Sequence, residues 1–120
     1  MKTRVIQNSR IPKLLSWFIP IKAITIGPFI FVDGEPSETL LSHEMIHVQQ
    51  YKELWYVGFL FLYLMDWVHG LLVYRNFREA YRAIRFEQEA RYGEKDSGYL
   101  SARQRFAWKS FSVRAEATDG

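Results

Sequence analysis

The apolar segment 55–74 places the strongest limit on how this chain of 120 residues can fold. The segment has about the length of a membrane-spanning helix. Asp66 and His69 lie three residues apart within it and would share one face of a helix. An ionisable pair is costly in lipid unless it faces protein or water, and the sequence has no second apolar span to cover that face. We therefore expect a helix that is buried in a small core or lies on a membrane surface, in preference to a true span.

The length and composition favour one globular domain. We expect a single domain over residues 1–120, with a core at about 22–92 and a frayed tail at 113–120. Hydrophobic residues make up 48% of the chain and charged residues 24%, which excludes a disordered protein. The net charge of +3 is too small to indicate nucleic acid, so we expect no nucleic-acid partner.

Two absences from the sequence limit the kind of site and its location. Cysteine is absent, so a metal site must use histidine, aspartate or glutamate. The apolar stretch 14–21 is short, contains Pro20 and precedes no small-residue cleavage site, so we expect no signal peptide. These features predict a cytoplasmic protein, with membrane association through residues 55–74 as the alternative.

The remaining patterns predict a mainly helical α+β fold with a short N-terminal sheet. β-Branched and aromatic residues predict extended structure over 21–32, which Gly27-Pro28 divides into two short strands or one kinked edge strand. Ser37 can cap a helix that runs to about Glu53. The other expected segments are an irregular stretch at 1–20 and helices at 55–74, at 77–92 with Gly93 closing it, and at 99–112.

Residues 43–47 read His-Glu-Met-Ile-His and match the H-E-x-x-H pattern of zinc hydrolases. On a helix, positions i and i+4 project from the same side, so the imidazoles of His43 and His47 can bind one Zn²⁺. Glu44 lies one residue round the helix, where its carboxylate can reach a water on the metal without displacing a ligand. The alternative is a surface His-Glu-His triplet without metal. We predict a zinc site with Glu44 as the catalytic base.

The third ligand is suggested by a downstream segment. The metzincin extension of the motif requires Gly and His where this chain has Gln50 and Glu53. Residues 86–91 read Phe-Glu-Gln-Glu-Ala-Arg, and together with the motif they resemble the gluzincins, metallopeptidases whose third zinc ligand is a glutamate on a later helix. The resemblance implies Glu87 as that ligand, with Arg91 at a position where the family has aspartate. The small size is similar to the minigluzincins, which have a short sheet, a motif helix and a glutamate helix.

Glu89 is the rival of Glu87 for this role. The two residues lie about 200° apart on a helix, so one of them alone can face a metal. Glu87 is preferred because its face also carries Ala83 and Ala90, small residues that would let two helices approach closely. The alternative for both glutamates is a solvated helix on which they pair with arginines.

The predicted activity is hydrolysis of a bond in a peptide or protein substrate. Zn²⁺ held by His43, His47 and Glu87 would keep one position open for water, and Glu44 would take the proton of that water and pass it to the leaving amine. An edge strand within 24–32 could add the substrate as a further strand, as the resemblance to gluzincins also implies. The alternatives are a non-catalytic zinc-stabilised domain and a membrane-surface or assembly protein that retains a silent zinc core.

Other polar residues have weaker expected roles. Asp66 could accept a hydrogen bond from the distal N–H of His43 or His47, and His69 could stabilise an oxyanion. An equally good alternative is an Asp–His pair that satisfies itself at a helix surface. Four tyrosines could each donate a hydroxyl to an oxyanion, and the sequence does not choose among Tyr51, Tyr81, Tyr92 and Tyr99.

Overall fold

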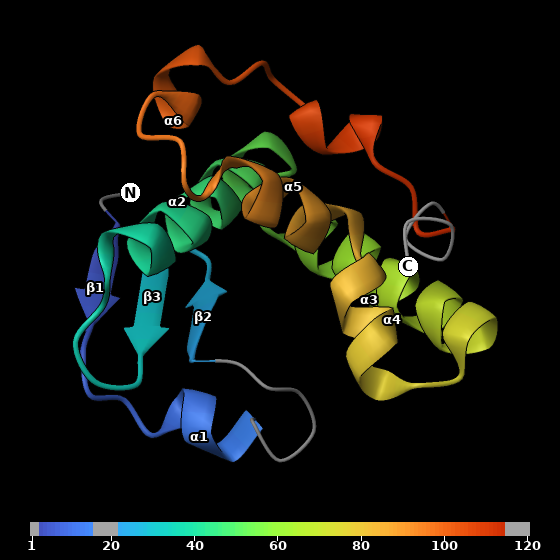
Figure 1. The fold of residues 1–120 in the computed structure, drawn as a ribbon, viewed down its shortest axis with the longest axis horizontal. Coiled ribbons are helices and arrows are strands. Elements are labelled where there is room, and N and C mark those ends of the chain that lie inside the picture. Colours follow the sequence, from blue (N-terminus) through green and yellow to red (C-terminus); the bar gives the residue numbers. More distant parts are fainter. Residues whose placement is uncertain (1–2, 16–21, 115–120) are drawn as a thin grey trace.

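A three-stranded mixed sheet lies at the N-terminal side of the molecule (Figure 1). The computed structural model describes residues 3–15 and 22–114. The strands β1 (Arg4–Ile6), β2 (Ala23–Ile26) and β3 (Phe29–Val32) have the order β1-β3-β2. Strands β2 and β3 form an antiparallel hairpin, and β1 pairs with β3 in parallel. The turn between β2 and β3 has Gly27 at a φ of 60° followed by Pro28, and the two short strands expected on either side of it are confirmed. The strand order leaves β2 at an edge of the sheet.

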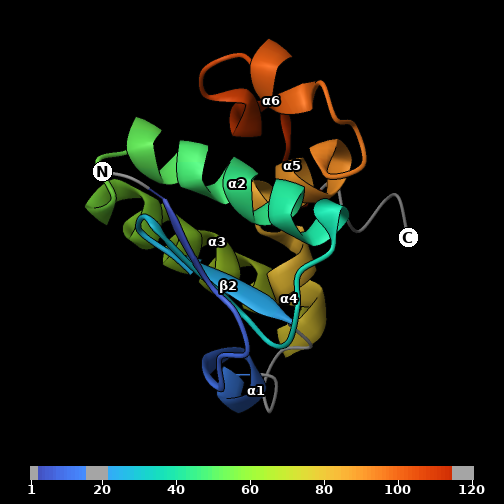
Figure 2. The same ribbon diagram turned by 90° about the vertical axis from the view of Figure 1, so that its left-hand side faces the viewer.

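Helix α2 (Glu38–Glu53) packs against the sheet and carries the H-E-x-x-H motif (Figures 1 and 2). It begins as predicted, because the Ser37 side chain accepts a hydrogen bond of 3.1 Å from the Leu40 amide. Alternating side chains of β2 and β3 point toward this helix, which gives a small apolar layer of Ala23, Ile30, Val32 and Val48.

A second apolar core joins α2 to the later helices α3 (Val57–Tyr74) and α5 (Arg85–Gly93). Its centre is a stack of aromatic rings in which Phe59 contacts Tyr51 at 3.8 Å and Phe86 at 4.5 Å between ring centroids. Trp108 from the C-terminal segment packs edge-on against Phe86. The two cores lie on different sides of α2, so this helix is held in place by the sheet and by the helices together.

Helix α3 buries one face and exposes the other. Phe59, Asp66 and Gly70 form the buried face. Gly70 meets α4 (Phe77–Ala83) so closely that a Cβ added to it would lie 2.9 Å from the Ala80 Cα. By length and composition the helix could cross a membrane. Because 17% of its residues are buried in the protein, it is mostly exposed and is not the core helix that the sequence suggested as one alternative. The exposed apolar side chains of the helix are Val57, Leu60, Phe61, Leu64, Met65, Val68 and Leu72.

Three sequence expectations about local structure were wrong. Residues 77–92 do not form one helix, because Ile84 has an extended ψ of 128° and separates α4 from α5. The segment 1–20 is not irregular throughout, since pairing with β3 orders β1 and a short helix α1 (Ile11–Leu15) follows it. The segment 99–112 forms α6 (Tyr99–Ala102) and the 3₁₀ helix η1 (Ala107–Ser110) in place of one helix. The expected tail at 113–120 lies mostly outside the described residues.

Candidate metal centre

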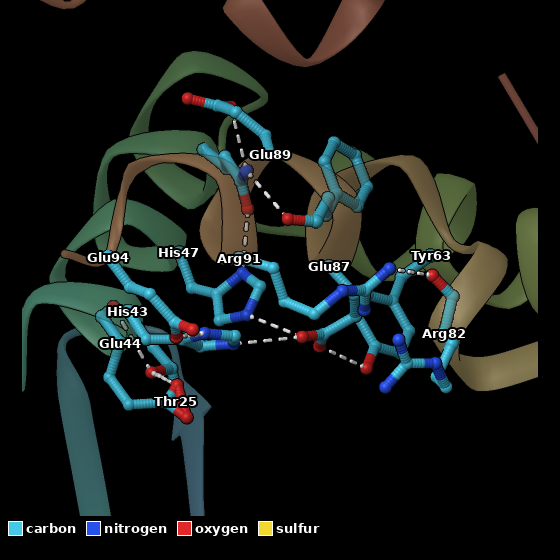
Figure 3. Close-up of polar contacts among 12 residues, drawn as sticks. Thr25, His43, Glu44, His47, Tyr63, Arg82, Glu87, Glu89, Arg91 and Glu94 are labelled. Atoms are coloured by element: carbon cyan, nitrogen blue, oxygen red, sulfur yellow. Dashed lines mark hydrogen bonds and ion pairs between the residues drawn. The ribbon is translucent and has the colours of Figure 1, made fainter. Parts of the chain in front are cut away.

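Two histidines of α2 and one glutamate of α5 meet at the contact between these helices (Figure 3). His43 and His47 lie one turn apart, with ring centroids separated by 5.0 Å. Glu87 approaches from α5, and its Oε1 lies 3.0 Å from Nε2 of His43 and 3.1 Å from Nε2 of His47. One carboxylate oxygen therefore faces both imidazole nitrogens at once.

The spacing of these three donor atoms fits a small metal ion. In a tetrahedral zinc site with bonds of 2.0–2.2 Å, neighbouring donor atoms lie about 3.3–3.6 Å apart. The two Glu87–histidine distances of 3.0 and 3.1 Å are shorter than this by a few tenths of an ångström. A small outward shift of the side chains would therefore admit an ion between them. His43, Glu44 and His47 also offer donor atoms that all lie within 4.8 Å of one another, so the group is a candidate metal-binding site.

The charges of these three residues shift one another's pKa values. Burial opposes a charged imidazole at His47, but the Glu87 carboxylate outweighs it and raises the pKa of His47 to about 9. Burial also favours a neutral Glu87, yet the charge of His47 and hydrogen bonds from both histidines hold the Glu87 pKa well below its ordinary value. Burial lowers the pKa of His43, but the hydrogen bond to Glu87 and the negative charges of Glu87 and Glu44 together raise it above its ordinary value. A metal ion would therefore have to displace protons.

Each candidate histidine ligand is oriented from behind by a second polar residue. Nδ1 of His43 lies 2.7 Å from Oε2 of Glu94, and Nδ1 of His47 lies 2.7 Å from Oε1 of Gln50. These partners accept an Nδ1 proton and direct each Nε2 toward Glu87 (Figure 3). The gluzincin resemblance leaves Arg91 where an aspartate would support a ligand, and Glu94 and Gln50 supply such support here.

Gln50 is itself held in a buried network. Its amide nitrogen donates to the Phe86 carbonyl at 3.1 Å and to Oε1 of Glu89 at 2.9 Å. Glu89 in turn pairs with Arg103 at 2.6 Å, and the same guanidinium pairs with Glu53 at 2.9 Å. Glu89 therefore points away from the histidines and binds Gln50 and Arg103, while Glu87 faces the histidines. The structure therefore brings Glu87 to the histidines and Glu89 away from them, and the role of Glu87 as a metal ligand stays a prediction.

Glu44 lies beside the donors but is directed toward the sheet. Its Oε2 accepts a hydrogen bond of 3.1 Å from the Thr25 hydroxyl on β2. Burial raises its pKa above the ordinary value, although the neighbouring histidines oppose this effect. A carboxylate that Thr25 holds toward the sheet beside the histidines, with an increased affinity for protons, can act as a general base.

Most of the other predicted residues do not contact the candidate ligands. Asp66 does not contact either histidine, because its carboxylate binds the backbone N–H and guanidinium of Arg85 at 2.9–3.1 Å. His69 is exposed on α3 and does not pair with Asp66. Among the four tyrosines, Tyr51 donates to the Thr25 carbonyl and Tyr99 to Glu89, and Tyr92 is exposed. Tyr81 lies beside the site.

Some residues at the site were missed by sequence reasoning. Gln50 is three residues after His47, and Glu94 is seven residues after Glu87. Helical spacing puts each of them on the same face of its helix as the candidate ligand, and this spacing could have identified both. Tyr63 of α3 donates to Oε2 of Glu87 at 2.7 Å, and this contact depends on how two distant helices cross. Thr25 likewise reaches Glu44 through the packing of β2 on α2.

A small pocket opens next to the donors. It has a volume of about 170 Å³ and is lined by His43, Arg78, Tyr81, Arg82, Glu87 and Arg91. The pocket gives solvent and small ligands a route to Glu87 and His43. Its walls come from α2, α4 and α5.

Comparisons with protein-family models, curated proteins and solved structures returned no match for this chain. The resemblance to gluzincins therefore remains a prediction. It rests on the H-E-x-x-H motif, on the later Phe-Glu-x-x-Ala segment and on the convergence of their side chains in the fold.

Proposed function

We propose that the protein is a zinc-dependent peptidase in which His43, His47 and Glu87 hold the metal and Glu44 is the base. The observation that carries this proposal is the position of Glu87, whose Oε1 faces both motif histidines from a separate helix. The donor set of two imidazoles and one carboxylate is that of catalytic zinc sites, which leave a fourth position open. When bound there, zinc polarises a carbonyl and lowers the pKa of water to about 7.

The protein's own residues would position the substrate and move the proton. Glu44, oriented by Thr25, would accept a proton from the attacking water and return it to the leaving amine. Tyr81 lines the same pocket as His43 and Glu87, and its hydroxyl is the best placed of the four predicted tyrosines to donate to an oxyanion. Strand β2 lies at a sheet edge next to Glu44, where a peptide could pair with it.

The test combines zinc analysis with a base variant. Purified wild type should contain close to one zinc per chain and cleave an unstructured protein such as casein. Glu44→Gln should keep its zinc and lose about a hundred- to ten-thousand-fold in activity, because it removes a general base while preserving side-chain size. Glu38→Gln, an exposed glutamate of the same helix, is the matched control and should retain full activity. Wild type that refuses added zinc would refute the proposal.

The second candidate is a non-catalytic zinc-stabilised domain. The observation that favours it is the small pocket, whose volume of about 170 Å³ leaves little room for a long substrate. A hydroxamate separates the two functions, because it needs an open position on the metal and does not depend on knowing the substrate. Zinc-loaded wild type that fails to bind acetohydroxamate at millimolar concentration would favour the structural role.

A further inference from the structure

Three arginines surround the pocket that contains the candidate ligands His43 and Glu87. Arg78 and Arg82 come from α4, and Arg91 comes from α5. In the sequence these residues alternate with acids and aromatics, which suggests an ordinary solvated helix face. The fold instead brings all three to one small cavity, and Figure 3 shows Arg82 and Arg91 beside Glu87.

The one carboxylate that lines this pocket is already bound by other side chains. Glu87 is the carboxylate among the lining residues, and it already faces both histidines and accepts a hydrogen bond from Tyr63. Arg91 donates to the Arg82 backbone carbonyl, which fixes the Arg91 side chain across the pocket. Within 3–15 and 22–114, no carboxylate pairs with the side chain of Arg78 or Arg82. These two guanidinium groups are available to an anion.

We propose that the site selects peptides that carry a carboxylate next to the bond to be cleaved, an inference that rests on the proposed function. Arginine presents paired donors that match the two oxygens of a carboxylate. Pockets for drug-sized ligands have volumes of about 300–1,000 Å³, and this cavity is much smaller. It therefore suits one carboxylate group rather than a long segment of peptide. The carboxylate can come from a free C-terminus or from an aspartate or glutamate side chain.

The test uses two pairs of hydroxamate-capped ligands on the zinc-loaded protein. One pair is capped alanine with a free C-terminal carboxylate and its C-terminal amide. The other is capped glutamate amide and capped glutamine amide. The carboxylate member of at least one pair should bind about 10- to 100-fold more tightly than its neutral partner, as expected for charge-assisted hydrogen bonds to arginine. The pair that shows this preference identifies the source of the carboxylate.

Variants separate failure of this inference from failure of the proposed function. Arg78→Gln/Arg82→Gln should bring the carboxylate preference below about twofold while leaving the affinity for the neutral ligands unchanged. Arg105→Gln, an exposed arginine outside the pocket, should keep the preference. Equal binding of charged and neutral ligands by wild type would overturn the carboxylate preference and leave an open zinc site standing. Failure of every hydroxamate to bind would overturn the open site and the preference together.

The exposed apolar face of α3 carries a second, independent inference. Its side chains include Phe61 at 62% exposed and Leu72 at 73% exposed, and they follow a helical spacing over about 27 Å. The turn before the helix has positive φ angles at Trp55 and Tyr56 and leaves Trp55 86% exposed. A contiguous apolar face of this kind on a small protein indicates a partner.

We infer that this face lies on the surface of an anionic lipid bilayer. Two exposed cations flank the apolar helix in the chain: Lys52 lies in the last turn of α2, shortly before α3 begins, and Arg75 directly follows the last residue of α3. Both can reach anionic headgroups, and an exposed tryptophan is typical of the membrane interface. The opposite face carries Asp66, which is buried and paired with Arg85, and packs on α4. One face alone is free, so the helix can lie in the interface without crossing it.

Flotation with vesicles tests this contact. The wild type should float with vesicles of phosphatidylcholine and phosphatidylglycerol, and Lys52→Gln/Arg75→Gln should weaken the binding about 25-fold at about fivefold per cation. Leu60→Gln/Leu64→Gln should abolish flotation, whereas Leu14→Gln, exposed on α1, should not. Protein that stays with the aqueous phase would overturn the inference. A dimer in sedimentation that Leu60→Gln/Leu64→Gln dissociates would assign the face to a second copy, and protease protection of residues 55–74 in vesicles would assign it to a span.

Discussion

Gln50 provides the sharpest test of the candidate metal centre, because it is fully buried and bonds directly to a candidate ligand. Gln50→Met keeps the length of the side chain and removes all of its polar atoms. The His47 Nδ1 atom then loses its acceptor at 2.7 Å, and the Phe86 carbonyl and Glu89 lose a donor. We expect the change to act both on metal affinity and on stability.

The two effects have separate magnitudes. Loss of a partner that orients a histidine ligand weakens metal binding by about 10- to 100-fold, which is about 1.4–2.7 kcal/mol. Each buried group left without a partner costs about 1–3 kcal/mol, and partial relaxation of the three groups gives an expected loss in stability of about 2–4 kcal/mol. Metal affinity must therefore be measured under conditions where the variant is folded.

The assay is competition for zinc against a chelator of fixed affinity, with circular dichroism to show that the variant is folded. Thermal unfolding gives an independent measure. Excess zinc should stabilise the variant less than it stabilises the wild type, and the difference should again be about 1.4–2.7 kcal/mol. Gln49→Met is the matched control, since Gln49 is the adjacent glutamine and lines a different pocket. A folded Gln50→Met protein whose zinc affinity stays within twofold of wild type would refute the reasoning.

Three further predictions use the same site and its surroundings. Glu87→Gln should lower zinc affinity by more than about 100-fold and Glu89→Gln by less than about tenfold, as measured by chelator competition; the reverse order would place the wrong glutamate at the metal. Zinc affinity, measured by calorimetry, should rise by about tenfold per pH unit for each displaced proton up to about pH 9, because His47 holds a proton below its raised pKa of about 9. The same proton stabilises the protein without zinc. This stabilisation should be complete below about pH 6.5 and lost as the pH rises through about 9, as measured by unfolding at a series of pH values. Asp66→Ala should destabilise the fold by about 1.5–3 kcal/mol in urea unfolding by removing the charged partner of Arg85, whereas an unchanged midpoint would mean that the pair contributes nothing.

The sequence predicted the parts of the candidate site that depend on local spacing. His43, Glu44 and His47 lie within five residues on one helix, so their relative positions follow from helical geometry alone. Glu87 required knowledge of how α5 crosses α2, and the resemblance to gluzincins pointed to it. The preference over Glu89 has a physical cause in the structure, because Arg103 and Tyr99 hold Glu89 on the far side of α5.

The failures of sequence reasoning share one cause, which is a long-range partner that changes a local preference. Residues 77–92 read as one helix, but Asp66 binds the Arg85 backbone N–H at the start of a second helix. The segment 99–112 read as a helix, but Arg103 and the Phe106 amide turn inward to bind the buried Glu53 carboxylate. Neither partner is visible in a local pattern, since each is separated from its target by many residues.

The polar network behind His47 is a poor way to stabilise a small protein, and this is an argument for its function. Glu89 is completely buried, and it shares Arg103 with the carboxylate of Glu53. Removing such ions from water costs several kcal/mol each, and apolar residues of similar size often replace buried ion pairs without loss of stability. The arrangement does, however, fix Gln50, which fixes the ring of His47 toward Glu87. A fold selected for stability alone has no need of these ions, whereas a site that must hold three donor atoms about 3 Å apart does.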